Sequence, residues 1–350
     1  MDNAAEENGI RTEPKPDCIL CGQHGDVLYV DLRDRLFGVP GEWALKKCPN
    51  AGCGLVWLDP APLKEDLWKA YATYYTHQDT VIVAENIIKR GYRFVRDCYL
   101  SLAYGYFGGQ VPSRYKLLGF LMYFFPGRRA DVDFSVMYLP AKPRGRLLEI
   151  GCGNGQMLNF MGALGWEIEG IDFDPAAVEN ARHKGLRVAL GSLEEQRYRD
   201  REFDAIIMSH VIEHVADPKC LLVECHRILK PGGVLSMVTP NMESMGSRIY
   251  KRSWLHLDPP RHLALFNCRA LQALAHSAGF SSITARTTIR DAHALFWGSH
   301  SIKKRGDFVM GTQPGLCTKT LMLSLRLAEG ALLKVFPRKG EEISLLGIKP

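Results

Sequence analysis

Apolar and amphipathic segments alternate along the second half of the chain. Leu147, Leu148 and Ile150 form an apolar run that is typical of a buried strand, and residues 157–161 are predicted to follow as a helix. The hydrophobic pattern predicts further strands at 166–171, 186–190, 203–209, 234–238, 281–288 and 342–348. It predicts further helices at 175–182, 219–230, 268–278 and 318–336. This alternation of strands and helices predicts an α/β fold.

Signals at the ends of several segments support these boundaries. Asp174 precedes Pro175, an order that is typical of a helix N-cap and the first helical position. Residues 230–233, Lys-Pro-Gly-Gly, are typical of a helix stop that leads into a strand. Helix 318–336 is predicted to have one apolar face, formed by Leu321, Leu325, Ala328, Leu332 and Val335.

Residues 61–140 contain helical stretches that are rich in aromatic side chains and are interrupted by Gly108-Gly109 and Pro126-Gly127. Aromatic stripes usually pack into a core, so we expect these helices to cover the sheet. A lid over an apolar substrate or a patch that contacts a membrane surface is the alternative. The basic pair Arg128-Arg129 beside Phe124-Phe125 keeps that alternative open.

Composition narrows the class of protein. The chain has 350 residues, 46% of them hydrophobic, and a net charge of +6, which permits an anionic substrate without requiring nucleic acid. The longest central apolar run, residues 117–125, is too short to span a bilayer. The first residues are acidic and polar rather than a signal peptide, so we expect the ten cysteines to lie in a reducing cytoplasm.

Two close cysteine pairs, Cys18 with Cys21 and Cys48 with Cys53, flank a short hairpin-like segment. Two turns that each present two thiolates suit tetrahedral zinc, so we predict a zinc ribbon whose closed site is structural. The second pair has four intervening residues rather than two, and His24 is an alternative ligand. Free buried cysteines or a disulfide are the other interpretations of these residues.

Glycines at 151, 153 and 155 follow the first core strand, and Glu149 precedes them. Glycine permits positive φ and close approach of a ligand to the backbone. Asp172 ends the next strand, 21 positions after Gly151, where a carboxylate can accept hydrogen bonds from two ribose hydroxyls. A dinucleotide fingerprint would need glycine at position 156, where Gln156 stands, and this disfavours an NAD-binding oxidoreductase.

The glycine stretch resembles motif I of the class I S-adenosylmethionine-dependent methyltransferases. Three further phrases are similar to this family: residues 55–60 after the cysteines, residues 210–218 after the fourth strand, and residues 230–233 before the fifth. The resemblance implies a Rossmann-like sheet of seven strands, with the last strand antiparallel and inserted between strands five and six. It also implies a zinc ribbon before this core.

The resulting organisation and cofactor site can be stated by residue. The chain is predicted to begin with a disordered tail at 1–16 and a zinc ribbon at 17–60. A helical cap or lid at 61–140 and a cofactor-binding core at 141–290 follow, and residues 291–350 form a C-terminal helix with the final strand. We expect S-adenosylmethionine to be contacted by Glu149, Gly151, Gly153, Gly155, Asp172, Ser192, Leu193 and Ser209. Many family members carry an acid that contacts adenine where this chain has Ser192.

The acceptor is expected over the carboxyl ends of the fourth and fifth strands. Candidates for a base there are His210, Glu213, His214, His256 and His262. We select His214 and His262, since the family motif places His214 at the mouth of the site. The alternatives are helix capping for Glu213 and a loop-anchoring hydrogen bond for His262.

A metal in the acceptor site is disfavoured. Glu213 and His214 resemble positions that bind a divalent cation in the ubiquinone-pathway O-methyltransferases. Those enzymes, however, carry an acid at the position where this chain has His210.

The predicted function is methyl transfer from S-adenosylmethionine to a small-molecule or lipid-like acceptor by in-line displacement. One rival is a zinc-ribbon RNA methyltransferase, and another is a non-catalytic protein that binds the cofactor as a scaffold. No Asn/Asp-Pro-Pro-Tyr phrase follows the fourth strand and the charge is modest, so we do not expect nucleic acid as a partner.

Overall fold

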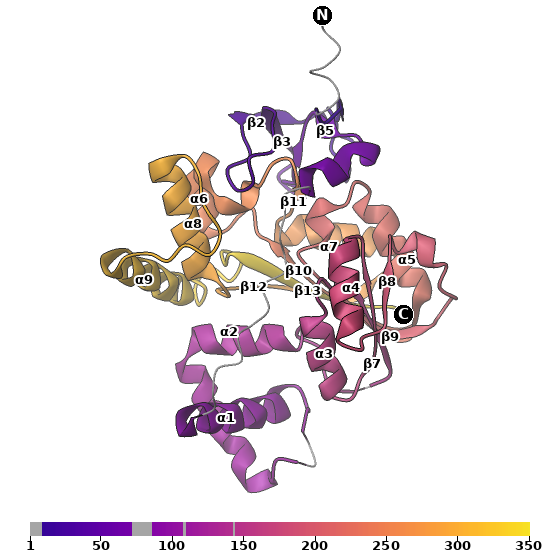
Figure 1. The fold of residues 1–350 in the computed structure, drawn as a ribbon, viewed down its shortest axis with the longest axis vertical. Helices are drawn as coiled ribbons and strands as arrows, with labels where there is room; N and C mark the ends of the chain where they lie inside the picture. The colour runs from indigo at the N-terminus through magenta and orange to yellow at the C-terminus, as the bar shows by residue number, and fades with distance from the viewer. Residues whose placement is uncertain (1–8, 72–85, 108–109, 143) are drawn as a thin grey trace, which may run out of the picture.

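The centre of the structure is a seven-stranded sheet (Figure 1). The computed structural model describes residues 9–71, 86–107, 110–142 and 144–350. In spatial order the strands are β12 (Ser281–Thr288), β13 (Glu342–Ile348), β10 (Leu229–Pro240), β9 (Phe203–Ser209), β6 (Arg146–Ile150), β7 (Glu167–Asp172) and β8 (Val188–Leu190). Strands β10, β9, β6, β7 and β8 pair in parallel, whereas β13 pairs antiparallel with both β10 and β12. The predicted α/β fold and the inserted antiparallel last strand are confirmed.

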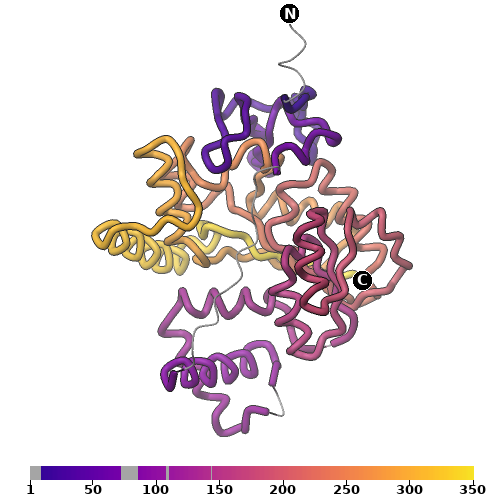
Figure 2. Tube along the Cα trace, viewed as in Figure 1, coloured from indigo at the N-terminus to yellow at the C-terminus, as the bar shows by residue number. Residues whose placement is uncertain are grey.

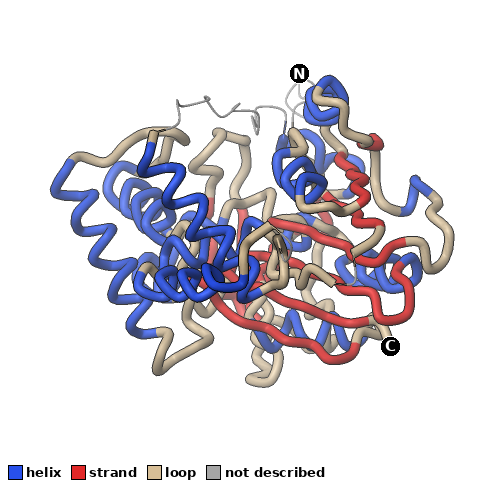
Figure 3. The backbone as a smooth tube through the Cα atoms, turned by 90° about the horizontal axis from the view of Figure 1, so that it is seen from below, coloured by secondary structure: helices blue, strands red, loops and turns tan. Residues whose placement is uncertain are grey.

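The sheet is buried on both faces because its strands send alternate apolar side chains in opposite directions. In β9, Ala205 and Ile207 pack with one set of helices, while Ile206 and Met208 pack with another. The first set contains α2 (Pro126–Ser135), α3 (Gln156–Ala163) and α4 (Pro175–His183), and the second contains α5 (Pro218–Ile228) and α7 (Cys268–Ser277). Figure 3 shows the strands running through the molecule between helices.

A second sheet joins the N-terminal region to the core. Its order is β11 (Ala264–Leu265), β4 (Val56–Leu58), β3 (Trp43–Lys47) and β2 (Asp26–Leu32). Strand β11 comes from the segment that precedes α7, so a piece of the core completes the sheet of the cysteine-bearing region. In Figure 2 the indigo N-terminal chain lies against this orange segment. The region 17–60 is therefore packed into the protein rather than attached by a linker.

The prediction that all of residues 1–16 form a disordered tail is wrong for the described part, residues 9–16. Strand β1 (Thr12–Glu13) pairs with β5 (Ala61–Pro62). The Arg11 guanidinium binds Asp66, and the Trp57 indole N–H donates to the Lys15 carbonyl at 2.7 Å. These long-range partners hold a segment that has no hydrophobic pattern of its own.

The described part of the region 61–140 is mainly helical after β5. It contains the 3₁₀ helices η1 (Lys64–Tyr71) and η2 (Ser113–Phe124), together with α1 (Ile87–Ala103) and α2. Residues 72–85 and Gly108-Gly109 lie outside the described residues.

The C-terminal region adds α6 (Met245–Tyr250), α8 (Ala292–Arg305) and α9 (Leu316–Leu332). The predicted apolar face of the last helix is partly wrong. Met322 and Glu329 are buried on α9, whereas Leu321, Ala328 and Val335 are exposed. The helix rests on α8 and α2 with a face that a purely apolar pattern does not identify.

Two details of the remaining elements matter for the site. Residues 230–233 belong to an irregular start of β10, because the pairing with β9 shifts between Leu229 and Val234. Short 3₁₀ turns occur at η3 (Glu194–Gln196), η4 (Ile212–His214), η5 (Lys251–Ser253) and η6 (Leu255–Leu257). Within the described residues, no helix is both long enough and apolar enough to cross a membrane.

Candidate functional site

The glycine turn joins β6 to α3 at the carboxyl end of the sheet. Gly151, Gly153 and Gly155 all have positive φ, between +51° and +76°. A Cβ on Gly155 would lie 2.2 Å from Leu186, so that glycine is needed for close packing. A Cβ on Gly153 would meet no heavy atom within 4 Å. A Cβ on Gly151 would likewise lie 2.5 Å from Val211, so the turn packs against the protein at two glycines and borders open space at Gly153.

Asp172 lies directly beside this turn. Its Oδ2 accepts a hydrogen bond from the Gly153 N–H at 2.7 Å, and its Oδ1 accepts one from the Asp174 N–H at 2.9 Å. Burial raises the pKa of Asp172, and these backbone donors oppose that shift. Asp174 caps α4 by accepting from the Ala176 N–H, as predicted. Each carboxylate oxygen of Asp172 retains a lone pair for a further donor.

Glu149 is the buried acid behind the glycines. Burial, together with the charge of Asp172, raises its pKa well above the usual range, and no described group hydrogen-bonds its Oε2. A carboxyl that is buried this deeply needs hydrogen-bond partners for its oxygens, whether it is protonated or ionised. The orphaned oxygen of Glu149, the open side of Gly153 and the carboxylate of Asp172 together fit a polar cofactor such as S-adenosylmethionine.

The other expected cofactor residues occupy different environments. Ser192 is exposed on the loop after β8, and its N–H donates to the Glu195 carboxylate at 2.8 Å. Leu193 is buried in the core, and Ser209 is the half-buried last residue of β9. These three residues therefore lie at the ends of β8 and β9, on the same edge of the sheet as the glycine turn.

A chain of aromatic rings extends from the buried part of the acceptor side toward the cofactor side. His210 stacks on His256, with ring centroids 5.7 Å apart, and His256 stacks on His262 at 6.2 Å. His262 meets His214 edge-to-face at 4.7 Å. Tyr71 continues from His214 to Phe173, with centroids 6.0 and 5.2 Å away. Phe173 follows Asp172, so the ring chain links the two sides of the site.

His210 is held as a cation at the buried end of this chain. Its Nε2 hydrogen-bonds Glu342 at 2.9 Å, and its Nδ1 lies 3.2 Å from Glu213, an ion-pair distance. Burial alone would lower the pKa of His210, but the two carboxylates outweigh it and raise the pKa to about 9. The backbone of His210 has φ of +54°, a strained conformation for this residue. His210 is therefore protonated at neutral pH and is excluded as a base.

The two carboxylates that contact His210, Glu213 and Glu342, each have a further partner. Burial raises the pKa of both carboxyls, but their cationic partners prevail and lower the values for Glu213 and Glu342 to about 2. The Arg290 guanidinium donates to Glu342 at 2.7 Å, and Thr239 donates to Glu213 at 2.9 Å. The network fixes the ends of β9, β10 and β13 to one another.

His214 and His262 remain candidates for a base. Burial lowers the pKa of His214 to about 4, and the proximity of His262 adds to the effect. His214 Nδ1 lies 2.9 Å from the Tyr71 hydroxyl and 3.1 Å from the Arg261 carbonyl oxygen. His262 Nδ1 lies 2.7 Å from the His256 carbonyl oxygen, the loop-anchoring contact considered from the sequence. Carbonyl oxygens only accept, so we assign the ring proton to Nδ1 and the lone pair to Nε2 in both histidines.

The same residues include a potential metal cluster. Glu213, His214 and His262 each offer a ligand atom, and these atoms lie within 4.8 Å of one another. The Glu213 carboxylate, however, already faces the protonated His210 and accepts from Thr239. A divalent cation held by these three residues would lie close to His210, and the buried Oε1 of Glu213 has no hydrogen-bond partner among the described residues.

Three members of the site were missed by sequence reasoning. Tyr71 lies within the segment 61–140, whose aromatic residues are predicted only to cover the sheet, and Glu342 is predicted only as the first residue of the final strand. Arg290 was not considered. Glu341-Glu342, two acids at the start of an apolar strand, was the available signal, because buried acids require partners.

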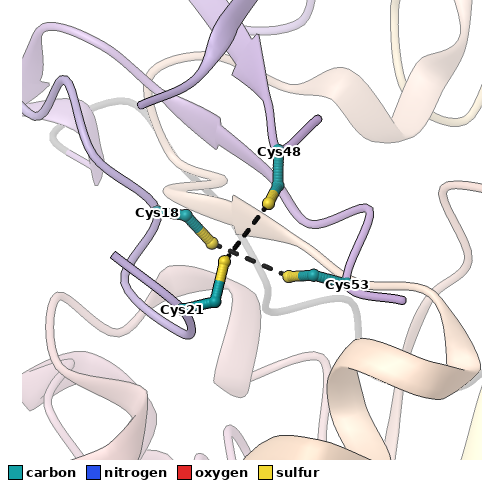
Figure 4. Close-up of side chains that lie close together, drawn as sticks. All are labelled: Cys18, Cys21, Cys48 and Cys53. Carbon is teal, nitrogen blue, oxygen red and sulfur yellow. Dashed lines mark hydrogen bonds between the residues drawn. The ribbon is translucent and has the colours of Figure 1, made fainter. Parts of the chain in front are cut away.

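The four cysteines of the N-terminal region converge from two turns (Figure 4). Cys18 Sγ lies 3.7 Å from Cys53 Sγ, and Cys21 Sγ lies 3.4 Å from Cys48 Sγ, so these are not disulfides. A tetrahedron with Zn–S bonds of about 2.3 Å has S–S edges of about 3.8 Å. The four thiols therefore fit zinc. His24 is exposed and pairs with Asp17 instead.

Comparison with known families gives a match over the core. Residues 128–285 match a methyltransferase domain family. A probable S-adenosylmethionine-dependent methyltransferase from Mycolicibacterium smegmatis is 32% identical over 155 residues, covering 44% of this chain and 56% of the relative. A ubiquinone biosynthesis O-methyltransferase from Cereibacter sphaeroides is 34% identical over 118 residues, covering 31% of this chain and 48% of the relative. The chain thus spans about half the length of the curated relatives it matches.

Solved structures give a weaker likeness. A S-adenosylmethionine-dependent methyltransferase from Thermotoga maritima, described as a possible histamine N-methyltransferase, is 22% identical with a TM-score of 0.44. The match covers 67% of this chain and 96% of that one.

Proposed function

The chain carries a class I S-adenosylmethionine-dependent methyltransferase domain, and on this basis we propose that it methylates a small or lipid-like acceptor. When bound, S-adenosylmethionine supplies a methyl group on a sulfonium that an electron-rich atom can displace. Positioning of reactants contributes about 7–11 kcal/mol in such reactions, so alignment is the main task of the protein. The observation that carries the proposal is the glycine turn closed onto Asp172, with open space at Gly153.

The cofactor residues have separate tasks in this proposal. Asp172 accepts the ribose hydroxyls with its remaining lone pairs while the Gly153 N–H keeps its carboxylate in place. Gly153 leaves room for the methionine portion, and Glu149 satisfies a polar group from behind the turn. Ser192 and Leu193 are proposed to border the adenine, and Ser209 to border the reaction centre.

His214 is the proposed base. Its Nδ1 proton is directed to the Arg261 carbonyl, which leaves Nε2 to accept a proton from the acceptor. His262 has the same tautomer by the same argument and is the second candidate. Relatives named as ubiquinone biosynthesis O-methyltransferases support a small-molecule acceptor.

Cys18, Cys21, Cys48 and Cys53 are proposed to hold a structural zinc ion. The separations of their sulfur atoms and the absence of any open coordination position in a four-thiolate set support a closed site.

The test begins with titration calorimetry of the full chain against S-adenosylmethionine and S-adenosylhomocysteine. Asp172→Ala should weaken both by about tenfold to a hundredfold, since a hydrogen bond to a charged group contributes about 1.5–3 kcal/mol. Asp174→Asn retains a helix cap two residues away and should bind normally. Incubation with methyl-labelled cofactor and a cell extract should then yield a labelled small molecule or lipid.

Two results would contradict the proposal in different ways. Absence of heat with either compound, on well-folded protein, would remove cofactor binding altogether. Normal binding without a labelled product from any extract would favour the non-catalytic scaffold.

A further inference from the structure

Helices α1 and η2 pack together on the side of the molecule away from the cysteine-bearing N-terminal region (Figure 1). An added Cβ on Gly119 would lie 2.7 Å from the Tyr99 Cα, so the two helices touch backbone to backbone there. The rings of Phe94 and Tyr115 are 5.7 Å apart. The Tyr99 hydroxyl donates to Asp133 on α2 at 2.6 Å, which anchors the pair to the core.

Helices α1 and η2 and the adjoining Phe125 expose large apolar side chains. Ile87 is 86% exposed, Phe124 78% and Leu117 66%. Other exposed members are Ile88, Tyr92, Phe94, Tyr115, Leu118, Phe120, Leu121, Tyr123 and Phe125. Single exposed apolar residues are ordinary, but a group of this size marks an interaction site. We call these twelve residues the α1–η2 surface.

The charge around the α1–η2 surface is predominantly positive. Between residues 86 and 130 the sequence contains eight Lys or Arg and one acid, Asp97. Asp97 pairs with Arg96 at 2.7 Å. Arg90 and Arg128 are exposed beside the apolar residues. The segment is therefore more positive than the chain as a whole, which carries +6.

We propose that the α1–η2 surface binds the face of an anionic phospholipid bilayer. Aromatic and aliphatic side chains would enter the boundary between headgroups and acyl chains, and the flanking basic residues would contact anionic headgroups. α1 has 17 residues and η2 has 12, so both lie along the surface rather than across it.

Charge complementarity favours this occupant over a second copy of the chain. Two copies joined through the α1–η2 surface would bring their basic residues together, which costs free energy. Exposed isoleucine, leucine and phenylalanine fit acyl chains and find no matching apolar surface on a phosphate backbone. The inference goes beyond the proposed methyl transfer, because surface binding requires neither cofactor nor acceptor.

Flotation of the full chain with vesicles tests the proposal. The protein should float with equimolar phosphatidylcholine and phosphatidylglycerol, about tenfold less with phosphatidylcholine alone, and less as salt is raised. Phe124→Ser with Phe125→Ser should reduce flotation by about tenfold or more. Arg90→Gln with Arg128→Gln should reduce it by about fivefold for each charge.

The controls separate the outcomes. Val27→Ser with Val223→Ser removes two exposed apolar residues elsewhere and should leave flotation unchanged. Equal or absent flotation with both kinds of vesicle would overturn the proposal, and this comparison uses the unmodified protein, so folding of a variant does not enter. A dimer in light scattering that the Phe124/Phe125 variant dissociates would also overturn it, in favour of a second copy. Calorimetry with the cofactor reports the proposed function independently.

Discussion

The centre of the cofactor half, Glu149–Asp172, comes from one continuous stretch of chain. The acceptor half instead collects its side chains from Tyr71, the segment 210–214, the segment 256–262 and Glu342. A strand, a turn and a neighbouring strand are enough to position Asp172 against Gly153. The acceptor half exists only after the N-terminal region, the loops after β9 and β10 and the last strand have packed together. The two halves should therefore respond differently to substitutions in distant parts of the protein.

Arg261 is the main link between the N-terminal region and the acceptor half. Its guanidinium is fully buried and binds Asp34 at 2.8 Å through two nitrogens and also Asp258. Asp34 belongs to the β2–β3 loop, while the Arg261 carbonyl contacts His214. Changes in the ribbon can thus reach the proposed base through one residue.

Loss of the proposed zinc ion should have the largest effect and should fall mainly on the acceptor half. Cys48→Ser is expected to lower the free energy of unfolding by about 5 kcal/mol or more, since structural zinc contributes about 10–16 kcal/mol in small zinc-finger peptides. Hydrogen exchange should accelerate over residues 255–265, next to β11, while residues 147–172 remain protected. Zinc content is measured in parallel by elemental analysis.

The control for this variant is Cys220→Ser, an exposed cysteine on α5. It should change neither zinc content nor exchange. Equal acceleration of exchange in both segments would contradict the division of the site into a local half and an assembled half.

Arg261→Met should have the next largest effect. It leaves Asp34 and Asp258 buried without their cation, and breaking such a pair costs about 3–5 kcal/mol. Urea unfolding measures the loss. Adding Asp34→Asn and Asp258→Asn should recover much of it, because the uncompensated charges are removed. Arg252→Met, an exposed arginine bonded to the Val30 carbonyl, is the matched control.

The His210 network predicts a pH dependence of a few kcal/mol. The folded pKa of His210 is about 9, above the usual value of about 6.5, so its stabilisation is complete below about pH 6.5 and is lost as pH rises through 9. The carboxyls of Glu213 and Glu342, with pKa values of about 2, remain ionised over this range. Urea unfolding across pH 6–10 should show the decline, and NMR should show a His210 midpoint near 9.

His210→Gln should flatten this decline, whereas His276→Gln, at an exposed position on α7, should leave it unchanged. A His210 resonance that titrates near pH 6.5 would show that the two carboxylates do not hold it as a cation.

The difference between the halves also explains what the sequence could predict. The glycines, Asp172 and the capping role of Asp174 follow from spacing and turn chemistry within short windows. The inserted final strand follows only from the family resemblance, because β13 pairs with strands that are distant from it in the sequence. Tyr71 carries no local signal, and Glu342 carries only that of an acid at the start of an apolar strand, because their roles come from partners 143 and 132 residues away. The same reason explains why residues 9–16 were expected to be disordered.

Tyr71→Phe should have the smallest effect and gives the finest test of the connection between the halves. The variant removes the hydroxyl that bonds His214 but keeps the ring against Phe173. We expect kcat to fall about fivefold to tenfold, since such a hydrogen bond contributes about 1 kcal/mol, with cofactor affinity unchanged. Tyr71→Leu should in addition weaken the cofactor, because the ring contact beside Asp172 is lost. Tyr29→Phe, on β2 of the ribbon, should change neither quantity. If Tyr71→Phe weakened the cofactor as much as Tyr71→Leu, the hydroxyl would act on the cofactor half, and the assignment of Tyr71 to His214 would be wrong.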